Sequence, residues 1–390
     1  MRQAPKPPEA IMNVSWRIYD ADAADWPAQV DRLWTRARGE PLLPDYFVKT
    51  TFVKLGGRLL ELLVDAGSAA IGLLFPRDLV AGRRIFTLRL HAFGPLPDDA
   101  QLISALTPLI APDMVHIYRP AEGRSFAGSH LPIGDFDLGA PAADELPAIK
   151  ALHAAIWGGG DEARYPNDLH SAEFGPGTSL VARKHGTLAG FLFGFVRFGG
   201  PADLAAAGVA TAIGIESQVM GIAPEFRRFG LAATLKRAQA RAALARGIGL
   251  IRWTADPLQF ANATLNFAKL RAVCGQIYPD YYPFRNALNR VPASRLALTW
   301  LPDSLYGRQG MLDVPAAREL SRYREVAILN DGPHRLTVRA GAPQIALEIP
   351  ADWTTLQHEH EALAAAWRRT SDGLLVEHLG FAPGRTCSAM

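Results

Sequence analysis

Cysteine is nearly absent from this chain: its 390 residues include only Cys274 and Cys387. The two lie far apart and neither belongs to a CxxC or CxxH pattern. The sequence therefore supports neither a disulfide framework nor a cysteine zinc site, and a reducing compartment is compatible with it. The run His358-Glu359-His360-Glu361 contains metal-ligand side chains. Residues two apart point to different faces of a helix, however, and HExxH spacing is missing. We therefore predict no metal site.

Long apolar runs are missing as well. No stretch reaches the roughly 18 uninterrupted apolar residues that a membrane-spanning helix needs. The segment Met1 to Ala10 is rich in proline and polar residues, and it lacks the apolar core of a signal peptide. These absences predict a soluble, cytoplasmic protein without a membrane partner.

Charge of one sign is not in excess, since 41 lysines and arginines are balanced by 38 aspartates and glutamates. The sequence has no block rich in lysine and arginine, which argues against a nucleic-acid partner. GxGxxG, Walker and GxSxG patterns are also missing. This removes the standard signatures of dinucleotide-binding proteins, NTPases and serine hydrolases.

The chain is longer than one hydrophobic core usually supports, so we expect two domains or one domain with large additions. Trp16 to Tyr118 has an α/β pattern, and proline and glycine punctuate Pro120 to Pro132, which we interpret as a linker. We place an N-terminal α/β domain at residues 1–130, a second domain at 131–300 and a C-terminal extension at 301–390.

The N-terminal domain is expected to contain short strands and two helices, at residues 24–38 and about 98–110. Its strands are expected at residues 16–18, 47–54, 58–65, 68–75, 85–93 and 114–118. Gly56-Gly57 is the expected turn between the second and third of these strands.

The rest of the chain also alternates between strands and helices. Strands are predicted at residues 135–138, 178–183, 187–197, 250–254, 276–282, 295–301, 326–329, 335–338 and 345–349, besides one that ends at Ile222. Helices are predicted at 144–157, after Gly230, around Asn262 to Leu270 and at 355–369, with a further apolar run at 374–379.

The stretch Glu216 to Lys236 contains the most informative pattern. A β-favouring run ends at Ile222, a proline-containing turn carries Arg227 and Arg228, and Gly230 opens an alanine-rich segment with helical spacing. The first turn of such a helix leaves backbone N–H groups unpaired at the positive end of its dipole. Small residues let an anion approach closely, and the arginines add charge. The pattern predicts a phosphate-binding loop.

The pattern Arg227-x-x-Gly230-x-Ala232 resembles the (Gln/Arg)-x-x-Gly-x-(Gly/Ala) motif of the GNAT superfamily of acyl-CoA-dependent N-acyltransferases. The resemblance covers about Asp135 to Phe381 and is strongest from Glu216 to Tyr282. It implies an α/β (α+β) fold with a mixed, mainly antiparallel sheet flanked by helices. The alternative is an unrelated βαβ unit whose helix begins at a glycine.

The resemblance implies that acetyl-CoA, or coenzyme A, is bound as a cosubstrate. The pyrophosphate is expected on the amides of about Arg228 to Ala232. The pantetheine is expected along Val219 to Ile222, where this strand splays from the next one. Asn262 resembles the family asparagine that contacts pantetheine, although helix N-capping also explains it. The expected cofactor-binding residues are Val219, Met220, Gly221, Ile222, Arg227, Arg228, Phe229, Gly230, Leu231, Ala232 and Asn262.

Two groups are candidates for catalysis. Glu216 resembles in position the glutamate that removes a proton from the amine in several family members, and the alternative is a surface carboxylate at a strand end. The N–H of Met220 or its neighbour is expected to polarise the thioester carbonyl. Ser217 is an alternative polar group on the other face.

The general acid of many family members, a tyrosine, is replaced by Phe267. Either the thiolate leaves unassisted, which a thiol pKa near ~8.5 makes tolerable, or Tyr278, Tyr281 or Tyr282 substitutes.

The sequence thus predicts an N-acetyltransferase that moves an acetyl group from acetyl-CoA to a primary amine by direct attack. The alternatives are a non-catalytic acyl-CoA-binding or sensor protein and a scaffold without a ligand. The acceptor is a small-molecule or peptide amine. Its identity, the acyl chain length and the oligomeric state are not specified by the sequence.

A faint internal repeat links the two halves. Ala142 to Ala148 matches Ala23 to Ala28 with a one-residue gap. Either the first half is a degenerate second copy, or the match reflects two ordinary helix starts. Phe93 to Asp98 has acid and proline where arginines and small residues are needed, so we expect no coenzyme A in the first half.

Overall fold

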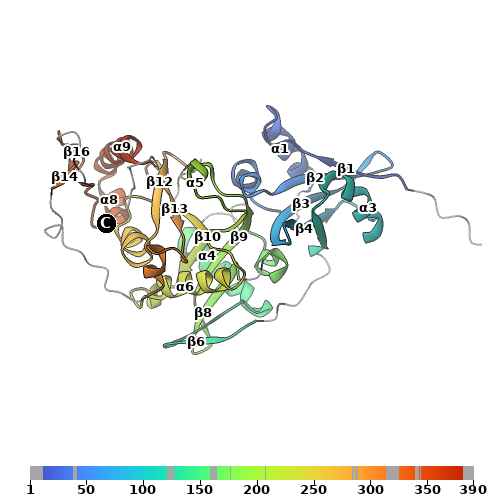
Figure 1. The fold of residues 1–390 in the computed structure, drawn as a ribbon, viewed down its shortest axis with the longest axis horizontal. Coiled ribbons are helices and arrows are strands. Elements are labelled where there is room, and N and C mark those ends of the chain that lie inside the picture. The colour runs from blue at the N-terminus through green and yellow to red at the C-terminus, as the bar shows by residue number, and fades with distance from the viewer. Residues whose placement is uncertain are drawn as a thin grey trace, which may run out of the picture. The chain divides into compact units, whose positions relative to one another are not determined.

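The computed structural model describes residues 12–37, 42–120, 126, 128–158, 165–175, 177–206, 208–282, 285, 289–312, 325–338, 342 and 344–380. They form two compact units (Figure 1). Of the described residues, the first unit contains 12–120, 165–169 and 173–175, and the second contains the rest. Both units are mixed α/β structures with mainly antiparallel sheets flanked by helices, so the predicted fold class is confirmed. The described helices include none that is long and apolar enough to cross a membrane.

The first unit is built on a five-stranded sheet of order β1-β2-β3-β4-β5. Its strands are β1 (Val14–Ile18), β2 (Arg58–Val64), β3 (Gly67–Val80), β4 (Arg83–Ala92) and β5 (Met114–Tyr118). Its α-helices are α1 (Trp26–Arg36), α2 (Asp45–Phe47) and α3 (Asp99–Ile110). Neighbouring strands are antiparallel except β4 and β5, which are parallel and joined through α3.

The predicted strand at residues 47–54 is wrong, because this segment is helical. After α2 it continues as the π-helical turn η1 (Val48–Phe52) and the 3₁₀ turn η2 (Val53–Leu55). The β-branched and aromatic residues favour a strand locally. Phe47, Val48 and Phe52 are fully buried, however, so helical spacing gives all three a place in the core. Gly56, at φ 90°, ends this helical segment and is not a hairpin turn.

The second unit contains an eight-stranded sheet of order β12-β13-β11-β10-β9-β8-β7-β6. Its strands are β6 (Leu131–Ile133), β7 (Phe136–Gly139), β8 (Ser179–Lys184), β9 (Thr187–Phe198), β10 (Ile213–Ile222), β11 (Ile251–Ala255), β12 (Val273–Tyr278) and β13 (Arg295–Trp300). Its helical elements up to β13 are η4 (Ala143–Glu145), α4 (Leu146–Trp157), α5 (Ala202–Ala206), η8 (Pro224–Phe226), α6 (Leu231–Leu244), α7 (Phe260–Ala263) and η9 (Thr264–Lys269). The 3₁₀ turn η10 (Gly307–Met311) follows β13, and the 3₁₀ turns η6 (Asn167–His170) and η7 (Ala172–Phe174), most of whose residues belong to the first unit, precede β8.

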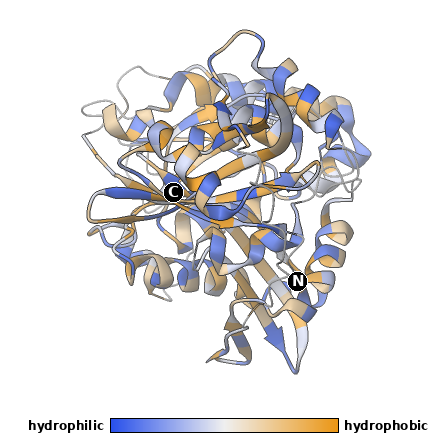
Figure 2. Cartoon of the chain, turned by 90° about the vertical axis from the view of Figure 1, so that its right-hand side faces the viewer, coloured by the Kyte–Doolittle hydropathy of each residue, from blue (hydrophilic) through white to orange (hydrophobic). Residues whose placement is uncertain are grey.

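Helices cover both faces of this sheet because apolar residues alternate along its central strands. Val181 and Phe191 are register partners and belong to the core beneath α4. The next pair, Leu180 and Leu192, belongs to the core beneath α6. Such alternation places successive side chains on opposite faces. In Figure 2 the helices contain both apolar and polar residues, as expected of helices with one buried side.

The two units share part of their order of elements, and one shared strand pair differs between them. In each, a helix joins the two parallel strands, α3 between β4 and β5 and α6 between β10 and β11. In the first unit the parallel pair is continuous from Ile85↔Met114 to Arg89↔Tyr118. In the second unit the register contains Ile215↔Ile251 and Glu216↔Arg252, and there the pairing of the described residues stops.

The C-terminal part of the chain packs onto the second unit. It contains β14 (Val326–Ile328), β15 (Asn330–Asp331), β16 (His334–Arg335), β17 (Gln344–Ala346), α8 (Trp353–Glu359) and α9 (Glu361–His378). Trp353 and Trp367 share a buried cluster with Leu258 and Val291, which lie beside β11 and β13 in sequence. The apolar run at residues 374–379, predicted separately from the helix at 355–369, belongs mostly to α9.

Candidate active site

The central strand β10 contains a β-bulge. Its register against β9 shifts between Glu216↔Phe195 and Val219↔Phe193, so β10 has one extra residue there. Gly194 lies on β9 opposite the bulge. A Cβ atom at this position would be 2.4 Å from the carbonyl oxygen of Glu216, so only glycine fits. The bulge therefore depends on a glycine of the neighbouring strand.

Beyond the bulge the described pairing of β10 with β11 ends, and we call the space between their unpaired segments the gap. β10 continues to Ile222 and β11 to Ala255, although their pairing stops at Glu216 and Arg252. The amide of Ala223 donates to Ala189 in the β8–β9 hairpin at 3.0 Å. Because successive amides of a strand point in opposite directions, those of Met220 and Ile222 face away from β9 and into the gap. The pairing ends at the place where the family resemblance implies that the two strands diverge.

The loop after β10 leads into an uncapped helix N-terminus. Gly230 has φ 75° and precedes α6, whose first turn has no side-chain cap. The N-cap residue lies in open space, since no atom is within 4 Å of a Cβ built on it. Among the described residues, none accepts a hydrogen bond from the amides of Arg228, Phe229, Gly230, Leu231 and Ala232. Unpaired amides at the positive end of a helix dipole are a favourable place for an anion.

Three cationic side chains surround this loop. Arg227 is exposed and donates from Nε to the carbonyl oxygen of Ile222 at 3.3 Å, which ties the loop to the end of β10. Arg228 is exposed and adopts φ 71°, a strained conformation for a residue with a side chain. Lys184 of β8 lies 5.5 Å from the ring centre of the exposed Phe229. Sequence reasoning missed Lys184 because it comes from another strand.

The side chain of Glu216 lies in a charged layer on the face opposite α6. Its Oε2 accepts from Arg197 of β9 at 3.1 Å, and the carboxylate side chain is 14% exposed. Next to this pair, Arg252 of β11 contacts Asp203 of α5 at 3.1 Å. Within the described residues Oε1 of Glu216 has no hydrogen-bond partner. One carboxylate oxygen is therefore held and the other is available to a water or an amine.

Tyr278 of β12 faces the same charged layer. Burial raises its pKa, and the charges of Arg252, Asp203, Glu216 and Arg197 act on it. Its hydroxyl donates to Gln276 at 3.0 Å. Two strands, β13 and β11, separate β12 from β10 in the sheet. Tyr278 is therefore not beside the gap.

A buried lysine lies on the α6 side of the sheet. The Nζ of Lys236 donates to Oγ of Ser217 at 2.8 Å and is 3.8 Å from the ring centre of Trp253. Burial lowers the pKa of Lys236 to about 7, against a smaller opposite effect of Glu216. Trp253 in turn donates from Nε1 to Asn266 of η9 at 3.1 Å. The signal in the sequence is a lysine within the apolar stripe of α6.

The segment after β11 places Asn262 and Phe267. Asn262 is exposed in α7 and is not its N-cap, which is Gln259, so the N-cap explanation of Asn262 is wrong. Phe267 is buried in the core that also contains Trp253. A phenyl ring therefore occupies this place, and it carries no transferable proton.

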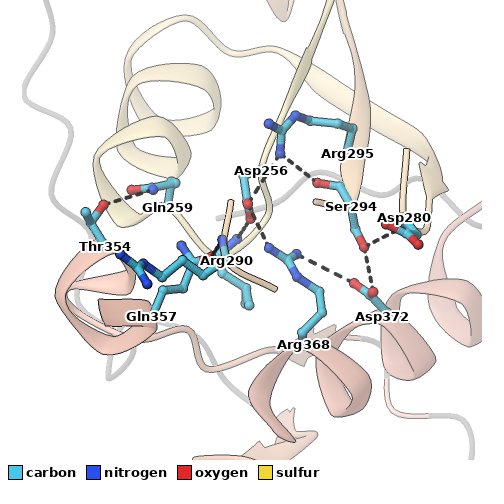
Figure 3. Close-up of polar contacts among 11 residues, drawn as sticks. Asp256, Gln259, Asp280, Arg290, Ser294, Arg295, Thr354, Gln357, Arg368 and Asp372 are labelled. Atoms are coloured by element: carbon cyan, nitrogen blue, oxygen red, sulfur yellow. Dashed lines mark hydrogen bonds and ion pairs between the residues drawn. The ribbon is translucent and has the colours of Figure 1, made fainter. Parts of the chain in front are cut away.

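The loop between β11 and α7 is fixed by a buried ionic network that reaches the C-terminal helices (Figure 3). Asp256 accepts from Arg295 of β13 at 3.3 Å and from Arg368 of α9 at 2.7 Å. Ser294 donates to Asp372 at 2.6 Å. Burial raises the pKa of Asp372. The C-terminal helices thus fix the start of the segment that follows β11.

No group of three or more histidine, cysteine, aspartate and glutamate side chains suited to a metal ion occurs among the described residues. Residues 381–390, which include Cys387, lie outside the described residues.

Comparison with solved structures finds similar chains at low identity. Arabidopsis thaliana NAA60 in complex with acetyl-CoA is 12% identical over 43% of this chain and 99% of its own, with a TM-score of 0.34. A mosquito arylalkylamine N-acetyltransferase-like 5b is 14% identical over 43% and 99%, with a TM-score of 0.31. A GNAT family acetyltransferase from Elizabethkingia anophelis with acetyl-CoA bound is 14% identical over 31% and 73%, with a TM-score of 0.25.

No protein-family model and no curated protein matches the chain. The solved structures named above have low identities and TM-scores, so they do not carry the functional argument. The geometry of the chain itself carries it.

Proposed function

We propose that the second unit is an acyl-CoA-dependent N-acyltransferase that moves an acetyl group from acetyl-CoA to a primary amine by direct attack. The observation that carries the proposal is the gap between β10 and β11, which leads to an uncapped helix N-terminus with unpaired amides. An elongated ligand with a phosphate at one end and a hydrogen-bonding arm suits this combination. Coenzyme A has both parts.

The amides from Arg228 to Ala232 hold the pyrophosphate, with Arg227, Arg228 and Lys184 contributing charge at the rim. The pantetheine lies along β10 from Val219 to Ile222, and its amides pair with backbone groups of β10 that face the gap. Asn262 is exposed and makes no hydrogen bond with a described residue, so it is available to the pantetheine.

The thioester carbonyl accepts a hydrogen bond from the amide of Met220, which stabilises the oxyanion that forms during attack. The acceptor amine approaches from the face that carries Glu216. A primary amine with a pKa near ~10 is mostly protonated at neutral pH and has to lose a proton before it attacks. Oε1 of Glu216 takes that proton, directly or through water, while Arg197 holds Oε2.

The rival function is a non-catalytic acyl-CoA-binding or sensor protein. Phe267 lacks a proton, and Glu216 is paired with an arginine, which favours this reading. Incubation with acetyl-CoA and a panel of small-molecule and peptide amines separates the two, because sustained release of free thiol is expected only of an enzyme.

The first unit is excluded from the proposal for two physical reasons. Its parallel strands β4 and β5 stay paired along β5, so they leave no gap. The N-terminus of α3 is closed by its own residues, since Asp98 accepts from the amide of Gln101 and Gln101 accepts from that of Asp98. A carboxylate in that position repels a phosphate.

The decisive test compares Gly230→Glu with Gly247→Glu. Both glycines have positive φ, 75° and 71°, and open space around the missing side chain, so the backbone strain is alike. Gly247 lies after the other end of α6. Coenzyme A at about 100 times its dissociation constant adds roughly 2.7 kcal/mol to stability. We expect a thermal shift with coenzyme A for the wild type and Gly247→Glu and none for Gly230→Glu. An unchanged melting temperature of the wild type removes the proposal.

A further inference from the structure

Lys236 lies at the inner end of the gap. Its side chain extends from α6, is 3% exposed and bridges the two diverging strands. Nζ donates to Ser217 of β10 at 2.8 Å and is 3.8 Å from the ring centre of Trp253 of β11. Ser217 and Trp253 each follow a member of the last strand pair, Glu216↔Arg252. The amine therefore occupies the point at which β10 and β11 separate.

Packing alone does not explain a lysine there. An ammonium group loses its hydration on burial, and its usual compensation is a carboxylate. Among the described residues, the charged group that acts on Lys236 is Glu216, and that carboxylate is bonded to Arg197. β11 presents the Trp253 ring, and η9 presents Asn266, which accepts from that ring. The neighbouring Arg237 is turned away and donates to the carbonyl oxygens of Gly310 and Leu312.

The proposed reaction needs a proton at this point. When the C–S bond of a thioester breaks, the sulfur leaves as a thiolate, whose conjugate thiol has a pKa near ~8.5. Lys236, with a pKa of about 7, is the stronger acid of the two, so proton transfer to the sulfur is downhill. Phe267 cannot supply that proton, and Tyr278 lies on the opposite face, two strands from β10.

We propose that Lys236 is the general acid that protonates the departing sulfur of coenzyme A. This role rests on the proposed acyl-transfer function. The amine nitrogen attacks the carbonyl carbon, a C–N bond forms, and the C–S bond breaks with its electron pair on sulfur. The ammonium group of Lys236 gives one proton to that sulfur and becomes a neutral amine. The acceptor nitrogen loses two protons, one to Glu216 before the attack and a second to water as the amide forms. Lys236 regains a proton from solvent after the thiol leaves. Ser217 positions Nζ and takes no part in bond formation.

The test begins with the wild-type full chain. Calorimetry with coenzyme A and thiol release from acetyl-CoA with the amine panel establish binding and turnover. Failure of either removes the proposed function before Lys236 is considered. If both succeed, Lys236→Met is compared with Lys150→Met, which changes an exposed lysine of α4. We expect Lys236→Met to bind coenzyme A like the wild type and to lose about a hundredfold in kcat, the range of general acid catalysis. Lys150→Met is expected to retain full kcat.

The pH dependence separates an acid from a structural residue. The ratio of wild-type kcat to that of Lys236→Met, measured with one acceptor at saturation, cancels the ionisation of the acceptor. We expect a constant ratio below the pKa of Lys236 and a fall of about tenfold per pH unit above it. Three results would each overturn the proposal. The kcat ratio could stay the same from pH 6 to pH 9, Lys236→Met could keep the kcat of the wild type, or Lys236→Met could lose coenzyme A binding.

Ser217→Ala provides a second, independent measurement. Because this hydroxyl positions Nζ and is not itself the acid, we expect Ser217→Ala to lower kcat less than Lys236→Met does and to keep a pH-dependent kcat ratio to Lys236→Met. Mass spectrometry of the wild type incubated with acetyl-CoA alone is expected to find no acetyl group on Ser217. An acetylated Ser217 would show that Lys236 acts as the base of a covalent route and would overturn the proposal.

Discussion

At the scale of single residues, the site contains two neighbouring ion pairs between an arginine and a carboxylate. Arg197 and Glu216 form one buried pair, and Arg252 and Asp203 form a second pair with the same 3.1 Å separation. Only the first pair includes a residue of β10, the strand that borders the gap. The carboxylates have nearly equal exposed fractions, 14% for Glu216 and 15% for Asp203. Each is therefore a natural control for the other.

Glu216→Gln is expected to lower turnover by a factor of 10²–10⁴, because an amide cannot take the proton of the amine. Coenzyme A affinity is expected to stay the same, since Glu216 faces away from α6. Asp203→Asn breaks a comparable ion pair and is expected to retain most of the turnover. Steady-state kinetics over a pH range and calorimetry check both. Equal turnover of wild type and Glu216→Gln would remove Glu216 as the base.

At the scale of elements, the site is made by two irregularities. The bulge in β10 reverses the direction of later amides, so that Met220 and Ile222 face the gap. The αL conformation at Gly230 leaves the first turn of α6 uncapped. α6 also contains Lys236 in its buried face, a polar residue where an apolar one would stabilise the fold more. The fold is thus less stable than it would be with an apolar residue at position 236.

Lys236→Met is expected to stabilise the fold near neutral pH. Lowering a lysine pKa from 10.5 to about 7 corresponds to about 5 kcal/mol of destabilisation at and below neutral pH, as an upper figure. Between pH 7 and pH 10.5 the unfolded state binds the extra proton, so wild-type stability rises with pH through this window. Lys236→Met does not show this rise in stability with pH, because methionine has no ionisable group.

Urea unfolding at pH 7 and at pH 10 measures this difference. The gain in free energy of unfolding from Lys236→Met is expected to be largest at pH 7 and to shrink at pH 10. A gain that is independent of pH would mean that Lys236 keeps an ordinary pKa in the folded state.

At the scale of the whole molecule, each unit contains a parallel strand pair joined by a helix, and the two units differ in how far that pairing continues. That the first unit is a degenerate second copy stays a prediction, and the shared order of strands and helices is the observation behind it. In the first unit, β4 stays paired with β5 along the whole of β5, and Asp98 caps the N-terminus of α3. The C-terminal helices are joined to the second unit through the ion pair of Arg368 and Asp256.

We expect calorimetry to find one coenzyme A per chain. Asp98→Ala is expected to cost about 1 kcal/mol of stability through loss of the N-cap and to create no second site, because β4 and β5 remain paired. Two bound molecules per wild-type chain, or a site that persists in Gly230→Glu, would contradict this assignment.

The sequence by itself determined the features that depend on local chemistry. The run from Glu216 to Ala232 specifies a strand, an arginine-containing turn and a helix that opens at a glycine, because backbone propensity and turn residues act over a few positions. The mixed, mainly antiparallel fold was predictable in the same way from alternating apolar residues. The strand predicted at residues 47–54 is wrong because burial of Phe47 and Phe52 outweighs local preference.

Only the tertiary structure decided how distant residues act together. Gly194 permits the bulge that directs the amide of Met220, and Arg197 holds Glu216, although both partners come from β9. Lys236 meets Ser217 and Trp253 from a third element. Spacing along the chain says nothing about such contacts, because side-chain neighbours across a sheet are set by register and by the packing of helices onto it.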